Sequence, residues 1–355
     1  MRVEEQLRGS LRAAGKSCEV LVTSDGSRLL LLPHGARVLG LFAPNRDENF
    51  YWTNPALSSS EQSDFFRAEG WHNSGGDRTW VAPEIGLHFP DFPDLSSYKV
   101  PSEVDPAAYD TERSGGSMQL STLVAVRLFR SHQANEVRIT RSWGAAANPL
   151  RYEEIWGQMA DVEYAGYTQK TSLQLLDRNV WGAGPIGAWN LLQLPHGGTA
   201  FLPLHGAVSP TVYFGSILPD DIEIKDDAIR YKMRSAGIQK IGIRAANSTG
   251  RAGYIYSSER SSVLVIRNVF INPSAEYIDV PWTDTGELGV RGDAFQICNV
   301  NTSEVGTFSE LEYHAPAIGR DTGQIEYDDV SQVWAFRGPE KLIRIIGKNL
   351  LSPTF

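Results

Sequence analysis

Short apolar runs separated by turn-forming residues recur along the chain and predict an all-β protein. The first runs are the segments 18–23, 28–33 and 36–43, which the turn-type sequences SDGS and HG separate. The pattern returns at Gln119 and continues beyond residue 300, in runs such as QLSTLVAVRLF, NEVRITRSW and SVLVIRNVF. So many closely spaced strands predict a large antiparallel β-sandwich or barrel, of which we favour the sandwich. A propeller is disfavoured because the sequence has no repeat of fixed period.

Helical spacing is weak outside the two ends of the chain, so only a few short helices are expected. A short polar helix is predicted within residues 1–16, and a second helix at about 340–351, directly after Gly338 and Pro339. The segment 87–116 is rich in Pro, Asp and Ser and predicts a long loop. Because no linker rich in Pro, Gly and Ser divides the chain, we expect one domain over residues 1–355.

The charge and hydropathy of the chain argue against two classes of partner, nucleic acids and membranes. The formal net charge is −9 and no cluster of Lys and Arg is present, which argues against nucleic acid as a partner. No apolar window is long enough for a membrane span, and the N-terminus lacks the apolar core of a signal peptide. We therefore expect a cytoplasmic protein that does not bind membranes; the oligomeric state stays open.

One late segment, TFSELEYHAPAIG at 307–319, carries an unusual row of titratable side chains. If it is a strand, Glu310, Glu312 and His314 point to the same face, because side chains alternate between the two faces. Two carboxylates and an imidazole make a poor core face and suit a polar cleft. A solvated strand face is the alternative interpretation.

An early segment, GWHNSGGDRTWVAPE at 70–84, is expected to form a loop with binding groups. Its arginine, Arg78, supplies a fixed fork of donors for hydroxyls or a carboxylate, next to Asp77. Trp80 offers a flat apolar surface of the kind on which sugar rings stack. His72 is a candidate acid or ligand, and Glu84 a candidate partner across the cleft. A structural turn with an Asp–Arg pair is the alternative.

Two further residues are candidates for the wall of a pocket. Trp189 stands beside glycines and is either a pocket wall or a core anchor at a tight bend, of which we favour the wall. Lys240 is a lone cation within an apolar strand, where it either points into a cleft or occupies the wet face of an antiparallel sheet.

Several classes of chemistry lack their motifs. The sequence has no P-loop, no G-x-G-x-x-G at a strand–helix turn, no H-E-x-x-H and no G-x-S-x-G. Phosphoryl transfer, dinucleotide redox chemistry and serine hydrolysis are therefore poorly supported. We expect no cofactor and assign no metal ligands, although Asp and Glu oxygens can hold a cation.

With its GGDRTW-x-APE and ELEYHxPA motifs, the sequence resembles the galactose-mutarotase-like (aldose 1-epimerase-like) superfamily, in particular a bacterial branch that carries both motifs. The resemblance covers about residues 20–350 and implies a mutarotase-like antiparallel β-sandwich. Leu311-Glu312-Tyr313-His314, with Pro316 after it, is similar to the segment that holds the catalytic base of the epimerases. The resemblance therefore implies that Glu312 is the base and that Arg78 holds sugar hydroxyls.

One departure from the epimerase pattern affects the expected activity. Ile186 takes the place of the histidine that acts as general acid in the epimerases. The acid would then be His314, Glu310, Asp77 or His72, and plain mutarotase activity is in doubt.

Two functions follow, both with a small-molecule carbohydrate as the partner. The first is an enzyme that acts at or near the anomeric carbon by carboxylate acid/base chemistry, as an epimerase, a glycoside hydrolase or a lyase. The second is a non-catalytic sugar-binding or sensing protein on the same fold. A purely structural role is less favoured, because polar and aromatic groups gather in a few segments. The sequence does not decide between these activities or identify the sugar.

Overall fold

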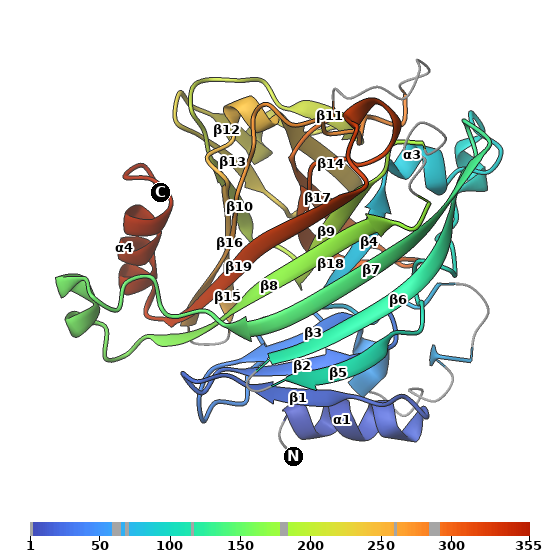
Figure 1. The fold of residues 1–355 in the computed structure, drawn as a ribbon. Coiled ribbons are helices and arrows are strands. Elements are labelled where there is room, and N and C mark those ends of the chain that lie inside the picture. Colours follow the sequence, from blue (N-terminus) through green and yellow to red (C-terminus); the bar gives the residue numbers. More distant parts are fainter. Residues whose placement is uncertain are drawn as a thin grey trace.

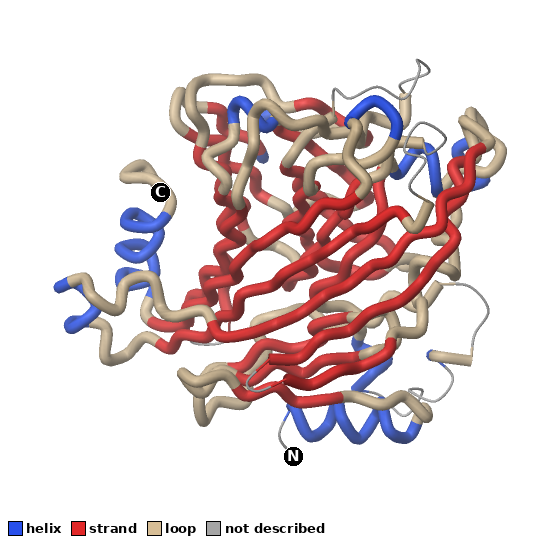
Figure 2. The backbone as a smooth tube through the Cα atoms, in the orientation of Figure 1, coloured by secondary structure: helices blue, strands red, loops and turns tan. Residues whose placement is uncertain are grey.

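Two large antiparallel sheets pack against each other across a shared apolar core (Figure 1). The structure is a computed structural model of the chain. It describes residues 3–58, 65–67, 71–114, 117–177, 184–258, 261–283 and 292–355. Within these ranges every pair of neighbouring strands is antiparallel, and strands far outnumber helices (Figure 2). The predicted antiparallel β-sandwich is confirmed.

The first sheet has nine strands and begins with the N-terminal meander. In spatial order its strands are β1 (Glu19–Val22), β2 (Arg28–Leu32), β3 (Arg37–Phe42), β4 (Asp77–Ala82), β9 (Gly187–Pro195), β18 (Gly306–His314), β17 (Phe295–Thr302), β14 (Gly237–Ile243) and β11 (Thr211–Phe214).

The second sheet has ten strands. In spatial order they are β12 (Ile222–Ile224), β13 (Ala228–Lys232), β10 (Thr199–Pro203), β15 (Arg251–Ser258), β16 (Ser261–Val269), β19 (Glu326–Gly338), β8 (Glu163–Leu175), β7 (Gln133–Ala145), β6 (Ser117–Leu128) and β5 (Asp110–Ser114).

The α-helices of the described residues are α1 (Val3–Ala13), α3 (Glu84–Leu87) and α4 (Glu340–Leu350). Helices α1 and α4 lie within the two ranges where helices are expected. Helix α1 packs on β2 and β3, which is why the leucines of β2 are buried on both faces. Helix α4 buries residues at the spacing of one helix face against β16 and β19. No described helix has the length and apolar character needed to cross a membrane.

The two sheets differ in how many of their faces are covered. Strand β7 alternates buried and exposed residues through most of its length, so the ten-stranded sheet has one face toward the core and one toward solvent. Strand β9 has eight buried residues in succession. Because successive side chains point to opposite faces, both faces of the nine-stranded sheet must be covered around β9. The second covered face carries the candidate site.

One local prediction was wrong, and another was right for only part of its segment. The segment around Arg78 is strand β4 and not a loop, although it contains two charged residues, because their partners lie on other strands. The predicted loop at 87–116 is mostly irregular, but it contains the short edge strand β5 and a 3₁₀ turn at Leu95–Ser97.

Candidate functional site

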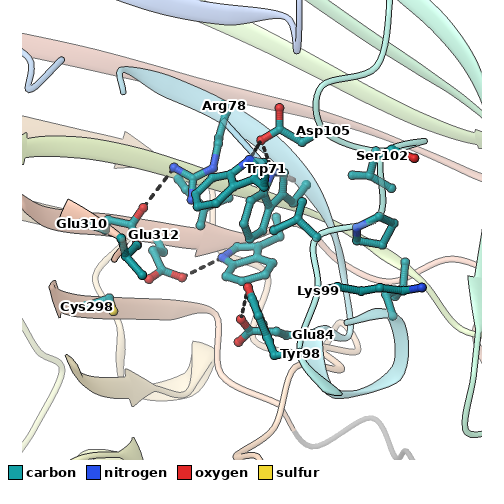
Figure 3. A pocket seen from close by; sticks show the side chains of 18 of the residues that line it. Trp71, Arg78, Glu84, Tyr98, Lys99, Ser102, Asp105, Cys298, Glu310 and Glu312 are labelled. Carbon is teal, nitrogen blue, oxygen red and sulfur yellow. Dashed lines mark hydrogen bonds and ion pairs between the residues drawn. The ribbon is translucent and has the colours of Figure 1, made fainter. Parts of the chain in front are cut away.

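The nine-stranded sheet carries a cavity of about 1050 Å³, to whose lining residues 125–127 of β6 also contribute. Side chains from β4, β9, β14, β17 and β18 form its floor. The irregular segment 98–106 and Trp282 contribute to its walls. Figure 3 shows Glu310, Glu312 and Cys298 on one side of the view, and Lys99 and Ser102 on the other side, away from the carboxylates.

Strand register arranges the floor in adjacent rows. One row joins Lys240, Cys298, Glu310 and Gln193, which are direct partners across β14, β17, β18 and β9. The next row brings together Arg78, Leu191 and Glu312 from β4, β9 and β18. Directly opposite residues of an antiparallel pair share a face. Residues far apart in the sequence therefore meet in the cavity because of their register.

Arg78 and Glu310, which belong to the two adjacent rows of the floor, form an ion pair. Arg78 Nη1 lies 3.0 Å from Glu310 Oε1, which also accepts a hydrogen bond from Gln193 Nε2 at 3.0 Å. The Arg78 guanidinium lies over the ring of Trp80, 4.4 Å from its centroid. Its Nε is buried and has no hydrogen-bond partner among the described residues.

Lys240 links two buried carboxylates. Its Nζ lies 3.0 Å from Glu312 Oε2 and 3.5 Å from Glu84 Oε2. Trp189 donates its Nε1–H to Glu312 Oε2 at 2.7 Å, and the Lys240 ammonium lies 4.4 Å from the centroid of that indole. The same oxygen, Glu312 Oε2, thus accepts the hydrogen bond from Trp189 and pairs with the Lys240 ammonium.

The environment of these groups shifts their proton affinities. Burial raises the pKa of Glu312 to about 7, a shift that Lys240 opposes and the carboxylates Glu310 and Glu84 enhance. Burial also raises the pKa of Glu84. Burial alone would lower the pKa of Lys240, but Glu312 and Glu84 outweigh it and raise that pKa above its ordinary value. Lys240 therefore stays cationic, while Glu312 can gain and lose a proton near neutral pH.

Asp105 fixes the aromatic wall beside Arg78. Its Oδ2 accepts hydrogen bonds from Trp71 Nε1 at 2.7 Å and Trp80 Nε1 at 2.9 Å. The same oxygen pairs with Arg37 Nη2 at 2.5 Å. Figure 3 shows Asp105 beside Trp71 and Arg78 at the edge of the cavity. Asp105 is therefore a positioning residue for the two indoles that flank the Arg78 guanidinium.

Three predicted site residues do not line the cavity. Asp77 precedes Arg78 on β4 and therefore points to the opposite face, between the sheets. There it pairs with Arg141 Nη2 at 3.0 Å and Arg267 Nη1 at 2.7 Å. Burial opposes its ionisation, but these two cations outweigh it and lower the pKa of Asp77.

The two histidines also lie elsewhere. His72 packs its ring against Phe65 and Phe66, with centroids 5.6 and 6.0 Å away, near helix α1. His314 follows Glu312 on the same face of β18, but its ring stacks on Trp189 and it is 3% exposed. Burial lowers the pKa of His314 to about 4, so it is neutral at pH 7. The other predicted residues line the cavity: Arg78, Trp80, Glu84, Trp189, Lys240, Glu310 and Glu312.

Sequence reasoning missed several residues of the wall. Asp105 and Tyr98 lie in the irregular segment 98–106, and Trp282 lies in another irregular segment. The absence of periodicity in these segments hid which way their side chains point. The one available signal was the aromatic and acidic composition of 91–106.

One group of described residues brings metal-ligand atoms together. An oxygen from Glu310, an oxygen from Glu312 and the Cys298 sulfur lie within 4.8 Å of one another. Both carboxylates already pair with cations, and burial raises the pKa of the Cys298 thiol well above its usual value. Since a thiol binds metals as the thiolate, this group fits a metal ion poorly.

One protein family matches nearly the whole chain. Its model, described as Family of unknown function (DUF6786), matches residues 11–354. Among curated proteins, no sequence matches the chain.

Several solved structures are similar to the chain in fold. A galactose mutarotase related enzyme from Lactobacillus acidophilus is 11% identical, with 90% of this chain and 97% of that chain covered and a TM-score of 0.47. An aldose epimerase homologue from C. elegans is 10% identical, with coverage of 92% and 100% and a TM-score of 0.40. Galactose 1-epimerase from Lactobacillus acidophilus NCFM is 9% identical, with coverage of 92% and 95% and a TM-score of 0.41. At such identities and scores, no residue's role transfers to this chain.

Proposed function

The chain belongs to the family of unknown function DUF6786, and from the geometry of its cavity we propose that it is a carbohydrate-active enzyme. In this proposal it acts at or near the anomeric carbon of a sugar by carboxylate acid/base chemistry. The observation that carries the proposal is the placement of Glu312. This carboxylate lies on the floor of a large cavity with aromatic walls, and burial raises its pKa to about 7. A general base or acid works best when its pKa is near the working pH.

The remaining groups suit a polyhydroxylated ligand. Arg78, Lys240 and Glu310 offer donors and acceptors on one floor, and the indoles of Trp80 and Trp189 lie beside them. Ligand sites typically combine an apolar lining with a few convergent polar groups. Sugars present both hydroxyls and apolar C–H faces, so they match this combination.

The simplest reaction for this arrangement is ring opening at the anomeric centre. Ionised Glu312 takes the proton of the anomeric hydroxyl, whose oxygen forms the aldehyde carbonyl as the bond from the anomeric carbon to the ring oxygen breaks. A second group protonates the ring oxygen. Reversal after rotation of the aldehyde closes the ring with the other configuration, without net proton uptake. Of the four candidate acids from the sequence, only Glu310 lines the cavity, but its ion pair with Arg78 favours the deprotonated carboxylate, so we leave the acid of the second transfer unassigned.

Bond cleavage fits the floor less well. Glu310 and Glu312 extend from the same face of one strand, whereas glycosidases place two carboxyl groups on either side of the scissile bond. Glu84, which reaches Lys240 from α3, is the carboxylate that could act from another side.

A non-catalytic sugar-binding protein is the second candidate. One observation favours it, because Glu310 and Glu312 are both paired with cations. The sequence resemblance agrees with it, since it implies that Ile186 replaces the acid of the epimerases. Paired carboxylates can hold hydroxyls without transferring protons.

Ligand screening followed by NMR tests the proposal. Thermal-shift screening of the intact protein against monosaccharides, uronic acids and disaccharides identifies sugars that stabilise it. Proton NMR of each sugar that binds then separates faster anomer exchange, bond cleavage and no reaction. The proposal expects exchange or cleavage. Binding without either supports the second candidate, and the absence of binding by any sugar contradicts both.

A further inference from the structure

The aromatic side chains of the cavity fall into two groups. Trp80 and Trp189 are 3% and 1% exposed, and the resident cations Arg78 and Lys240 lie over their rings. These buried indoles belong to the floor and offer little surface to a sugar ring. The predicted stacking of a sugar on Trp80 therefore needs another location.

A second aromatic group lies beyond Glu84 and is partly exposed. It consists of Tyr98, Phe214 and Trp282, all of which line the cavity; we call it the aromatic subsite. The Trp282 ring lies 4.3 Å from that of Phe214 and 5.6 Å from that of Tyr98, measured between centroids. Tyr98 is 36% exposed at the wall of the cavity, and one face of its ring stacks on His88 with the centroids 5.4 Å apart.

Glu84 holds the aromatic subsite next to the floor. Its Oε2 accepts a hydrogen bond from Trp282 Nε1 at 3.0 Å, and its Oε1 accepts one from the Tyr98 hydroxyl at 3.4 Å. Figure 3 shows Tyr98 beside Glu84, apart from Glu310. Through Lys240 the same carboxylate connects to Glu312. The polar floor and the aromatic subsite are thus neighbouring parts of one cavity, joined by one buried carboxylate.

The size of the cavity indicates how many rings it takes. About 1050 Å³ lies at the upper end of the range for pockets that hold drug-sized ligands. A single hexose is much smaller than such ligands and would leave much of this volume empty. A flat amphipathic ring attached to that hexose would occupy the second part.

We propose that the cavity binds a two-ring glycoside, with a first sugar at Glu312 and a second sugar ring against Tyr98 and Trp282. This inference rests on the proposed carbohydrate function and names its substrate class: disaccharide-sized glycosides and not free monosaccharides. Stacking of a sugar on aromatic rings removes apolar surface from water, which favours the second ring without new charged contacts.

Matched sugars and matched variants test the inference on the full chain. Calorimetric titration compares D-glucose with maltose and cellobiose, and D-galactose with lactose and melibiose. We expect at least one disaccharide to bind tenfold or more tightly than either of its component monosaccharides. Tyr98→Ala should remove that preference, whereas Tyr98→Phe, which keeps the ring and loses only the hydroxyl, should retain it. Tyr152→Ala is the surface control, because Tyr152 is 86% exposed on a different loop and does not line the cavity.

Each outcome supports or overturns a defined claim. Equal affinity for monosaccharides and disaccharides overturns the two-ring inference, as does a Tyr98→Ala variant that weakens both sizes equally. If monosaccharides then undergo anomer exchange in NMR, the proposed function survives without the inference. A disaccharide preference lost in Tyr98→Ala, but with no reaction, supports the inference and contradicts the enzyme. If no sugar of either size binds, both are overturned.

Discussion

Replacement of Lys240 by methionine tests the electrostatics of the cavity floor. Lys240 is 2% exposed, and its Nζ lies 3.0 Å from Glu312 Oε2 and 3.5 Å from Glu84 Oε2. Methionine has a similar length and no charge, so the substitution removes the cation and leaves two buried carboxylates without it. We expect a loss of stability that depends on pH.

The magnitude follows from the pair distance and the pKa of Glu312. At 3.0 Å and an effective dielectric constant of 20, the attraction between Lys240 and ionised Glu312 is about 5.5 kcal/mol. The loss of stability in Lys240→Met is smaller than this attraction, because Glu312 can take up a proton when the cation is removed. The pKa of Glu312 in the folded protein, about 7, already lies above its ordinary value of 4.5. This group therefore contributes stability below pH 4.5 that is lost as pH rises through 7.

In Lys240→Met the pKa of Glu312 rises further, so the folded variant keeps its proton at a pH where the wild type is ionised. Above pH 7 the proton retained on Glu312 then destabilises the variant relative to the wild type by about 1.4 kcal/mol per pH unit, and a proton retained on Glu84 would add to that loss. At pH 5.5 both proteins hold a protonated Glu312 and the difference should be small. At pH 8.5 the variant should lose about 2 kcal/mol more than at pH 5.5.

Urea unfolding of both proteins at pH 5.5 and pH 8.5 measures this difference in the free energy of unfolding. Lys225→Met is the matched control, because Lys225 and Glu223 form an ion pair of 2.9 Å in which the side chains are 45% and 49% exposed. An exposed pair contributes about 0–1 kcal/mol, so the control should change little at either pH. A loss in Lys240→Met that does not depend on pH, or does not exceed the control, would refute the reasoning.

Three further predictions follow from the same contacts. If ionised Glu312 is the base, kcat/KM should rise with pH through about 7, the pKa of that residue, and a flat profile from pH 5 to 9 would exclude this role. Asp105→Asn removes the charge that pairs with buried Arg37 and should lower the free energy of unfolding by about 3–5 kcal/mol. It should also shift tryptophan fluorescence, since the Asp105 carboxylate accepts hydrogen bonds from two indoles; unchanged stability and emission would contradict the positioning role. Asp77→Asn removes the carboxylate that pairs with Arg141 and Arg267. It should lower the free energy of unfolding in urea by about 3–5 kcal/mol. Sugar affinity should stay unchanged, because Asp77 lies between the sheets, and weakened binding in calorimetry would place it in the site after all.

Alternation of apolar and polar residues along the sequence was enough to predict the fold class. It was not enough to predict every strand. Strand β7 alternates over most of its length, and the helix α4 places its apolar residues on one face. Strand β4 was not predicted, because it contains charged residues of the types that are common in loops. Asp77 and Arg78 are buried only because Arg141, Arg267 and Glu310 arrive from distant strands.

The same alternation explains the success and the failure at the site. It placed Glu310 and Glu312 on one face of β18, and both line the cavity. Applied to β4, it would have separated Asp77 from Arg78, since neighbours on a strand point to opposite faces. Alternation does not indicate how far along the strand the cavity extends. His314 lies on the expected face of β18, but it stacks on Trp189 and does not line the cavity. Tyr98 and Trp282 lie in irregular segments, where no periodicity fixes the direction of a side chain.

The most direct test of the proposed chemistry compares Glu312→Gln with the wild type on a sugar that the wild type converts. Glutamine keeps the size of the side chain and can still accept the hydrogen bond from Trp189 Nε1, but it cannot take up a proton near neutral pH. We predict sugar binding within a few fold of wild type and turnover, followed by NMR, reduced by about 10²–10⁴-fold. Turnover at the wild-type rate in a variant that still binds the sugar would contradict the assignment of Glu312 as the acid/base group.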